Sequence, residues 1–183
     1  MAQRVLYSTV TSEVLQWQDT EKFSYGTAPT GTATLAVTSA EWANQSGQWY
    51  VVNGALTQTD PNALPKAQAS QIALLQSAFE KAEQAPVSLT LASGVTTSFG
   101  MSPHDWSKIV GIYSKYVAKG VALPSGYQIP DIAGKLQTVT VADIENLLNA
   151  GETQINNAID KLATLIAQIE SATTVTSVQS IAW

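Results

Sequence analysis

The chain contains no cysteine and a single histidine, His104, among its 183 residues. The absence of cysteine excludes a disulfide framework, a thiolate nucleophile and a cysteine-ligated metal site. One histidine cannot form a histidine metal cluster, which leaves a site built only from oxygen ligands as the one metal chemistry still open. We therefore expect no metal and no other cofactor.

Charged residues are also scarce, at 13% of the chain or about half of the usual share, and the formal net charge is −5. The nine basic residues do not cluster along the sequence, which argues against nucleic acid as a partner, because phosphate binding needs grouped Lys and Arg. The same deficit argues against an anionic membrane surface. A polar, weakly charged surface suits an extracellular or particle-associated protein, or one with much surface buried in an assembly.

Long apolar runs are missing as well. No stretch of about 18 apolar residues occurs, so we expect no membrane insertion. Residues 1–5 lack a basic region followed by an apolar run, which predicts that there is no signal peptide. We expect synthesis in a cytoplasm, and a location outside a cell would require transport as part of a particle.

Residue types that perform catalysis are present, but not in a catalytic pattern. His104 follows Ser102 and Pro103 at a predicted helix start, and the helix dipole disfavours a protonated histidine there. No serine lies in a triad motif, and no glycine loop could hold a phosphate. The N-terminal acids are too scattered for a paired-carboxylate hydrolase: Asp19, Glu21, Glu41 and Asp60. We expect no enzyme and no catalytic residue.

Residues 1–60 are predicted to form a small β-rich module. Strand-forming stretches recur at 4–8, 13–17, 33–37, 48–52 and 55–58. The last two are joined by Asn53-Gly54, the most favourable two-residue hairpin turn. Thr38, with Glu41 three residues later, indicates the start of a short helix.

Aromatic residues crowd this module, and they allow two interpretations. They either form the core of a domain with few aliphatic residues, or they are exposed and bind a partner or stack on the sugar rings of a cell-surface glycan. Alternation along the strand at 48–52 makes both of its faces apolar, so we expect the second face to be covered by a partner or another sheet. The candidate partner-binding residues are Trp17, Trp42, Trp49 and Tyr50.

Residues 61–66 predict a linker, because Pro61 and Pro65 interrupt any continuous element. A second domain is expected over residues 67–183. Its predicted elements are a helix over 66–84, a hairpin over 87–91 and 95–99, a helix from 102 to about 120, a linking segment over 122–129, a short strand over 136–139 and a long helix. The expected buried stripe of the second helix is Trp106, Ile109, Val110, Tyr113 and Val117.

The fold class is therefore α+β: a small N-terminal β-rich module followed by a helical domain with a β-hairpin and a long C-terminal helix. The long helix is predicted to begin at Thr140, which forms a capping pattern with Asp143, and to reach about Glu170. Residues 174–183 are predicted to fold back onto the bundle as a turn and an apolar plug.

The long helix has an apolar row that repeats every seven residues: Val141, Leu148, Ile155, Leu162 and Ile169. A second row, three residues on, contains the small residues Gly151 and Ala158, and both rows lie on one helix face. The first row is our candidate packing or oligomer face. It either packs within the domain or forms a coiled coil with other copies. The small residues would let a neighbouring element such as the hairpin approach closely.

Several short phrases follow one another along the second half of the chain: Ala-Pro-Val at 85–87, Ser-Gly-Val-Thr at 93–96, the helix entry at 139–144, Ala-Thr-Thr-Val at 172–175 and the ending at 178–183. Through these phrases and their order, residues 68–183 resemble a domain common in tail-fibre-associated proteins of bacteriophages and prophages. The patterns at 17–20, 40–42 and 49–54 are similar to the short β domain of tail-fibre assembly proteins.

This resemblance implies a non-enzymatic protein that helps phage tail fibres to trimerise and, in some members, stays bound at the fibre tip. It implies a trimeric tail-fibre protein as the partner and the virion tail fibre as the location after synthesis in the host cytoplasm. It transfers no catalytic residue. Two alternatives stay open: a structural or adhesive fibre component that contacts a host receptor or surface glycan, and a small carbohydrate-active enzyme, which the scattered acids disfavour.

Overall fold

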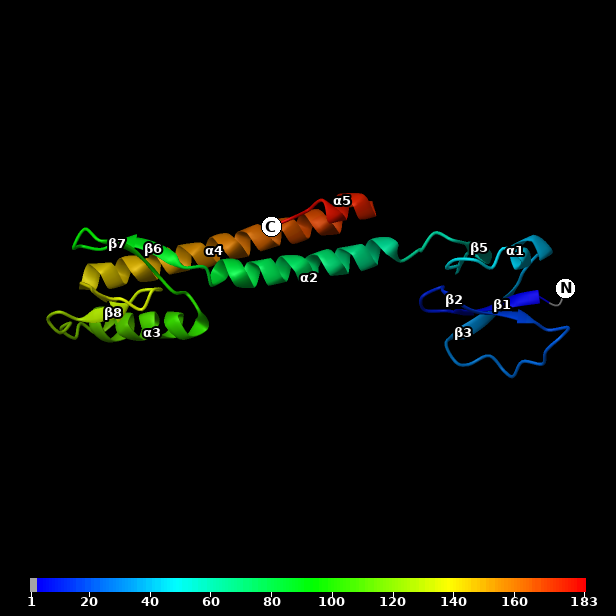
Figure 1. The fold of residues 1–183 in the computed structure, drawn as a ribbon, viewed down its shortest axis with the longest axis horizontal. Helices are drawn as coiled ribbons and strands as arrows, with labels where there is room; N and C mark the ends of the chain where they lie inside the picture. Colours follow the sequence, from blue (N-terminus) through cyan, green and yellow to red (C-terminus); the bar gives the residue numbers. More distant parts are fainter. Residues whose placement is uncertain (1–2) are drawn as a thin grey trace. The chain divides into compact units, whose positions relative to one another are not determined.

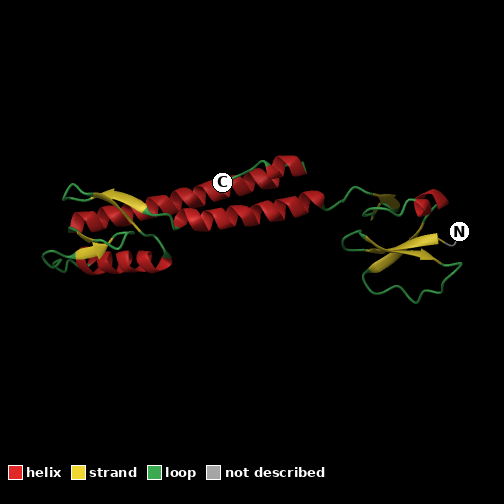
Figure 2. Cartoon of the chain, viewed as in Figure 1, coloured by secondary structure: helices red, strands yellow, loops and turns green. Residues whose placement is uncertain are grey.

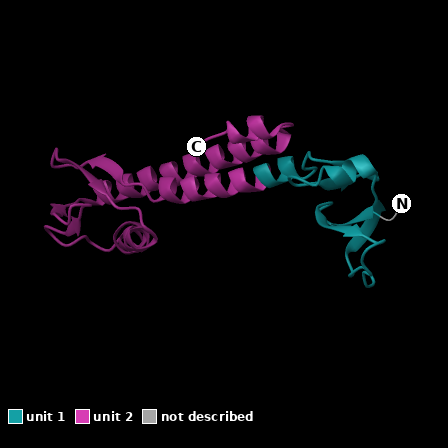
Figure 3. Cartoon of the chain, turned by 45° about the vertical axis from the view of Figure 1, so that its right-hand side comes forward, with its two compact units in different colours: residues 1–67 teal, residues 68–183 magenta. Residues whose placement is uncertain are grey.

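A computed structural model describes residues 3–183, and the chain forms two compact units, residues 1–67 and 68–183 (Figure 3). The fold is α+β, as the sequence predicts. Small antiparallel sheets are interspersed with helices, and the longest helix lies near the C-terminus (Figure 2). Within the part of the chain that is described, no helix has both the length and the apolar character needed to cross a membrane.

The first unit is built on a three-stranded antiparallel sheet in the order β2-β1-β3. Its strands are β1 (Gln3–Ser8), β2 (Val14–Asp19) and β3 (Thr32–Ala36). The central strand carries Val5, which lies opposite Trp17 on one side and Leu35 on the other. Val5 is completely buried, so the sheet centre is also the centre of this unit's core.

The rest of the first unit follows its predicted turns and caps. It contains α1 (Ser39–Ala43), β4 (Tyr50–Val52) and β5 (Ala55–Thr57). Thr38 and Glu41 form a reciprocal capping box at the start of α1. Asn53 and Gly54 both have positive φ angles, 52° and 77°, which is the backbone of a type I′ hairpin turn.

The predicted linker contains the start of a helix, α2 (Ala63–Glu83), which crosses the boundary between the two units. Our prediction that Pro65 interrupts a continuous element is wrong. Pro65 lies in the first helical turn, where a backbone N–H has no partner within the helix and its loss costs little. The Asp60 carboxylate accepts a hydrogen bond from the Asn62 N–H at 2.8 Å and orders the chain just before the helix.

The second unit begins within α2, at residue 68, and continues with two small hairpins and a helix between them. The elements are β6 (Val87–Thr90), β7 (Thr96–Phe99), α3 (Pro103–Tyr113), the π-helical turn η1 (Ser114–Ala118), β8 (Gln128–Pro130) and β9 (Leu136–Thr138). Strand β8 lies mostly in the segment that we expected to be a link, because three residues ending in proline show no strand pattern. Its pairing with β9 makes it a strand.

One member of the expected α3 stripe is misplaced. Val110 is 41% exposed, whereas Ile112 packs against the core. Each residue turns a helix by about 100°, so Ile112, three residues after the buried Ile109, shares its face while Val110 turns away.

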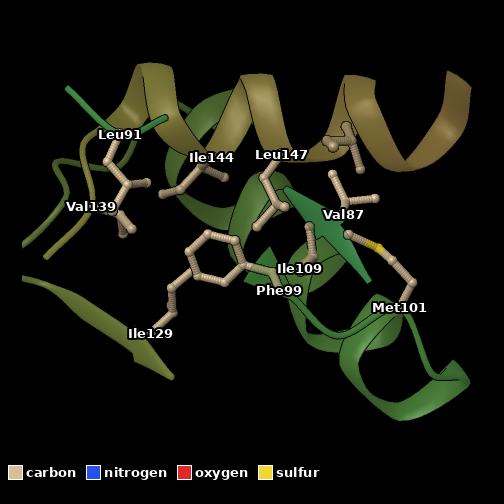
Figure 4. Close-up of a cluster of buried hydrophobic side chains, with 10 residues drawn as sticks. Val87, Leu91, Phe99, Met101, Ile109, Ile129, Val139, Ile144 and Leu147 are labelled. Atoms are coloured by element: carbon tan, nitrogen blue, oxygen red, sulfur yellow. The ribbon is translucent and has the colours of Figure 1, made fainter. Parts of the chain in front are cut away.

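The long helix α4 runs over Val141–Ser171, and a short helix α5 follows at Val175–Gln179. The N-terminal half of α4 covers the main core of the second unit, to which the hairpins and α3 also contribute (Figure 4). The buried members are Val87, Leu91, Phe99, Met101, Ile109, Ile129, Val139, Ile144, Leu147 and Leu148. The helix start at Thr140 and its capping box with Asp143 are as predicted.

The C-terminal half of α4 lies antiparallel to α2, and together they form a two-helix arm (Figure 1). At the C-terminal end of α2, the side-chain amide of Gln154 in α4 donates hydrogen bonds to the carbonyls of Ala82, Glu83 and Ala85. Near the N-terminal end of α2, the side-chain amide of Gln68 donates a hydrogen bond to the Ile169 carbonyl. The tail folds back as expected. The Trp183 ring lies 6.4 Å from that of Phe79.

Candidate functional site

Three of the four predicted partner-binding residues meet in one aromatic cluster. Trp17, in β2, contacts Trp42 edge-to-face at a centroid distance of 6.0 Å and Trp49 at 6.2 Å. Trp17 and Trp42 also pack against the buried valines of the first unit. All three indoles are half-buried, so the rings belong to the core of a small module and remain partly accessible.

Tyr50, the fourth residue, is buried at 8% exposure and belongs to a polar network instead. Its hydroxyl donates to the Asp60 carboxylate, which also accepts a hydrogen bond from the Lys66 ammonium at 2.8 Å. This bond lowers the pKa of Asp60 and raises that of Lys66, while burial and the Asp60 charge raise the pKa of Tyr50. The network attaches the start of α2 to β4, so Tyr50 has a structural role here.

The residues of the predicted apolar row of α4 differ in how deeply they are buried. Leu148 and Ile169 are buried within the second unit, Ile155 and Leu162 are half-buried, and Val141 is 38% exposed. Four of the five members thus contact the same chain, as expected for packing within the domain.

The groove expected at the small residues exists, but α3 fills it rather than the hairpin. The six-membered ring of Trp106 lies over Gly151, where a Cβ atom would come within 2.4 Å of the indole. Trp106 was among the residues that the second-helix stripe predicted to be buried, and it is half-buried against the main core.

The two-helix arm leaves apolar side chains uncovered, and we call this set the arm surface. Leu74 of α2 and Ile159 of α4 are 63% and 47% exposed. Three more apolar residues of these helices are half-buried: Ile72, Leu165 and Ile166. Two helices alone cannot enclose a wide apolar stripe, so this surface is a candidate for contact with a partner.

The carboxylates with shifted pKa values make structural hydrogen bonds. Hydrogen bonds from the Thr38 N–H and hydroxyl lower the pKa of Glu41. The pKa of Asp131 is lowered mainly by a hydrogen bond from the Gln137 amide, and also by hydrogen bonds from the side chain of Thr97 and the backbone N–H groups of Ala133 and Lys135. Burial raises the pKa of Asp143, but hydrogen bonds from Thr140 and Ala92 outweigh it and the net pKa is lowered. Across residues 3–183 no three groups of the His, Cys, Asp or Glu type gather where a metal could bind.

A pocket of about 430 Å³, which the sequence did not predict, lies in the second unit between α3 and η1 on one side and β8 on the other. Its residues come from 99–116 and 127–130, two segments whose proximity no local pattern indicates. One signal in the sequence could have indicated it: Lys108 and Lys115 are seven residues apart, a spacing that places both side chains on the same side of a helix.

No protein family, curated protein or solved structure matches this chain.

Proposed function

We propose that this chain is a non-enzymatic tail-fibre-associated protein of a bacteriophage or prophage. It binds the distal part of a trimeric fibre, assists fibre trimerisation and stays at the virion fibre tip. The proposal is supported by the ordered phrases along both halves of the sequence and, above all, by the uncovered arm surface.

The arm surface suggests how such a protein would act. Burial of apolar area stabilises an interface by about 25 cal/mol per Å², and Leu74 and Ile159 are available for it without any unfolding of the arm. A fibre subunit that has not yet trimerised exposes its own apolar contact surface. The arm would cover that surface until the trimer forms and so prevent aggregation.

The weak charge of the arm is consistent with this role. Along α4 from residue 152 to 171 only Glu152, Asp160, Lys161 and Glu170 are charged, and no described ion pair involves them. A surface with few charges can bind and release a partner without the large desolvation cost of buried ions.

An adhesive component that contacts the host receptor is the second candidate. The observation in its favour is the aromatic cluster, whose three indoles are partly accessible on one small unit. Such rings suit contact with a receptor or a glycan.

The test is co-expression with the fibre proteins encoded in the same gene neighbourhood, followed by size-exclusion chromatography with light scattering. We expect a soluble fibre trimer only when this chain is present, and a stable complex whose mass gives the stoichiometry. A fibre trimer that forms equally well alone and never binds this chain would overturn the proposal. Binding of the isolated chain to host cells without any effect on the fibre would favour the adhesive alternative.

The arm surface is tested by the double variant L74D/I159D. Both positions are exposed, so the fold should persist while the yield of fibre trimer falls severalfold. The matched control is Q76D/N157D, which places the same two charges at exposed polar positions of the same helices. Equal loss of trimer in both variants would show that added charge, and not the arm surface, is responsible.

A further inference from the structure

The pocket between α3, η1 and β8 is lined by buried apolar side chains and by two tyrosines. Ile109 and Ile129, 6% and 8% exposed, are part of its lining. The rings of Tyr116 and Tyr127 lie 5.4 Å apart with an angle of 58° between them. The volume of about 430 Å³ is within the usual range of small-molecule sites, about 300–1,000 Å³.

Two lysines give the pocket a positive charge in a chain whose net charge is −5. Lys108 and Lys115 both line it, and neither forms an ion pair with any acid among residues 3–183. The Lys115 ammonium lies 4.9 Å from the centroid of the Tyr116 ring, so the cation and the aromatic face are presented together. The one acid in the lining, Asp105, already accepts a hydrogen bond from the Ser102 hydroxyl at 2.6 Å.

The backbone beside the pocket is unusual, and this observation is independent of the side chains. Residues 114–118 form the π-helical turn η1 directly after α3. Such turns are rare in α-helices and are often found at functional sites, because the extra residue per turn displaces side chains from their regular positions. Here the turn carries Lys115 and Tyr116, the two residues that combine charge with a flat ring.

We propose that this pocket binds an acidic sugar residue, a pyranose that bears a carboxylate. The C–H face of the sugar ring would lie against the tyrosine rings, which are flat and apolar. The carboxylate would lie beside Lys108 and Lys115, and the Gln128 side chain, also in the lining, offers a donor and an acceptor to ring hydroxyls. This inference does not depend on the proposed fibre function, because it concerns the isolated chain.

Other ligand classes fit the lining less well. A phosphate ligand is held best by a backbone anion nest or by arginines that bind two oxygens at once, and the lining has two lysines and no arginine. A neutral sugar would leave both ammonium groups without a counter-charge. An aromatic carboxylate would satisfy the lysines but would make no use of the polar side chain of Gln128.

The experiment is a titration of the full chain with methyl β-glucuronide, followed by amide chemical shifts. We expect shifts that saturate and are confined to residues of the 99–116 and 127–130 segments. Methyl β-glucoside, which lacks the carboxylate, should bind at least tenfold more weakly, and so should benzoate, which lacks the pyranose. Absence of saturable shifts in these segments, or benzoate binding as well as the glucuronide, would overturn the proposal.

Variants link the binding to the two lysines. K108Q/K115Q should weaken glucuronide binding at least tenfold, and because both side chains are exposed the amide spectrum should otherwise stay that of the folded chain. The matched control is K81Q/K135Q, which removes the same charge from exposed lysines outside the pocket and should bind normally. An equal loss in both variants would attribute the effect to net charge and would also overturn the proposal.

Discussion

Gly151 shows how one residue determines the approach of two helices. It lies in the middle of α4, where glycine is a poor helix former, and the position is fully enclosed. A Cβ atom there would meet the Trp106 ring at 2.4 Å and the Met101 sulfur at 3.2 Å. Because Gly151 has no side chain, the Trp106 indole of α3 can occupy the space beside it.

We expect Gly151→Ala to destabilise the second unit by about 1–3 kcal/mol, because overpacking outweighs the helix propensity gained. The measurement is the free energy of unfolding in urea. Gly111→Ala is the matched control: Gly111 is also helical, but a Cβ atom there would meet nothing within 4 Å, so this change should stabilise by about 0.5–1 kcal/mol. If both variants were stabilised, Trp106 would have to move aside without cost.

The start of α4 shows how an element is attached to its surroundings. The Asp143 carboxylate accepts hydrogen bonds from the Thr140 N–H at 2.8 Å and the Thr140 hydroxyl at 2.7 Å, which cap the helix. It also accepts one from the Ala92 N–H at 2.8 Å, in the turn between β6 and β7. One buried carboxylate thus begins the long helix and connects it to the hairpin.

We expect Asp143→Asn to lower the stability by about 1–3 kcal/mol at pH 7, because the neutral amide replaces a charged acceptor of three hydrogen bonds. The pKa of Asp143 is lowered in the folded state, so its contribution is present above the unfolded pKa of about 3.9 and is lost as the pH falls through the folded pKa. The difference in Tm between wild type and variant should therefore shrink as the pH falls from 7 to about 2.5.

The control for this pH series is Asp160→Asn, at an exposed position of the same helix. Its effect should stay within about 0.5 kcal/mol throughout. A constant difference between wild type and Asp143→Asn across the pH range would mean that the carboxylate charge is not what stabilises the helix start.

At the scale of the whole molecule, the main hydrophobic clusters of the two units share no residue among positions 3–183. The first unit is centred on Val5, Val37 and Val51, and the second has its main core under the N-terminal half of α4. Proteins open in cooperative units that follow such cores. A core mutation should therefore destabilise the unit that contains it and leave the stability of the other unit unchanged.

We expect Ile144→Ala to reduce hydrogen-exchange protection across α3 and α4 by about 2–5 kcal/mol while β1 to β3 keep theirs. Val5→Ala should do the reverse, with a loss of about 1.5 kcal/mol or more in the sheet, because two buried methyl groups are removed. The measurement is amide exchange resolved by residue. Loss of protection in both units from either change would contradict separate cores.

Most elements of this fold were predictable, because their signals are local. A capping residue acts within about three positions, as at Thr38 and Thr140, and the Asn53-Gly54 turn needs only its own backbone. The repeat from Val141 to Ile169 likewise specifies a helix and its apolar face through neighbouring turns. The α+β class and the position of the longest helix follow from these patterns.

The contacts that each helix or strand makes with other elements were not predictable, because they join residues far apart in the chain. Nothing local indicates that Trp106 would fill the space above Gly151, or that Gln68 would donate a hydrogen bond to the Ile169 carbonyl. The pocket arises in the same way, from two segments that meet only when α3 and β8 pack. Short-range chemistry thus specified the elements, and packing between distant segments determined which surfaces are closed and which stay open to a partner.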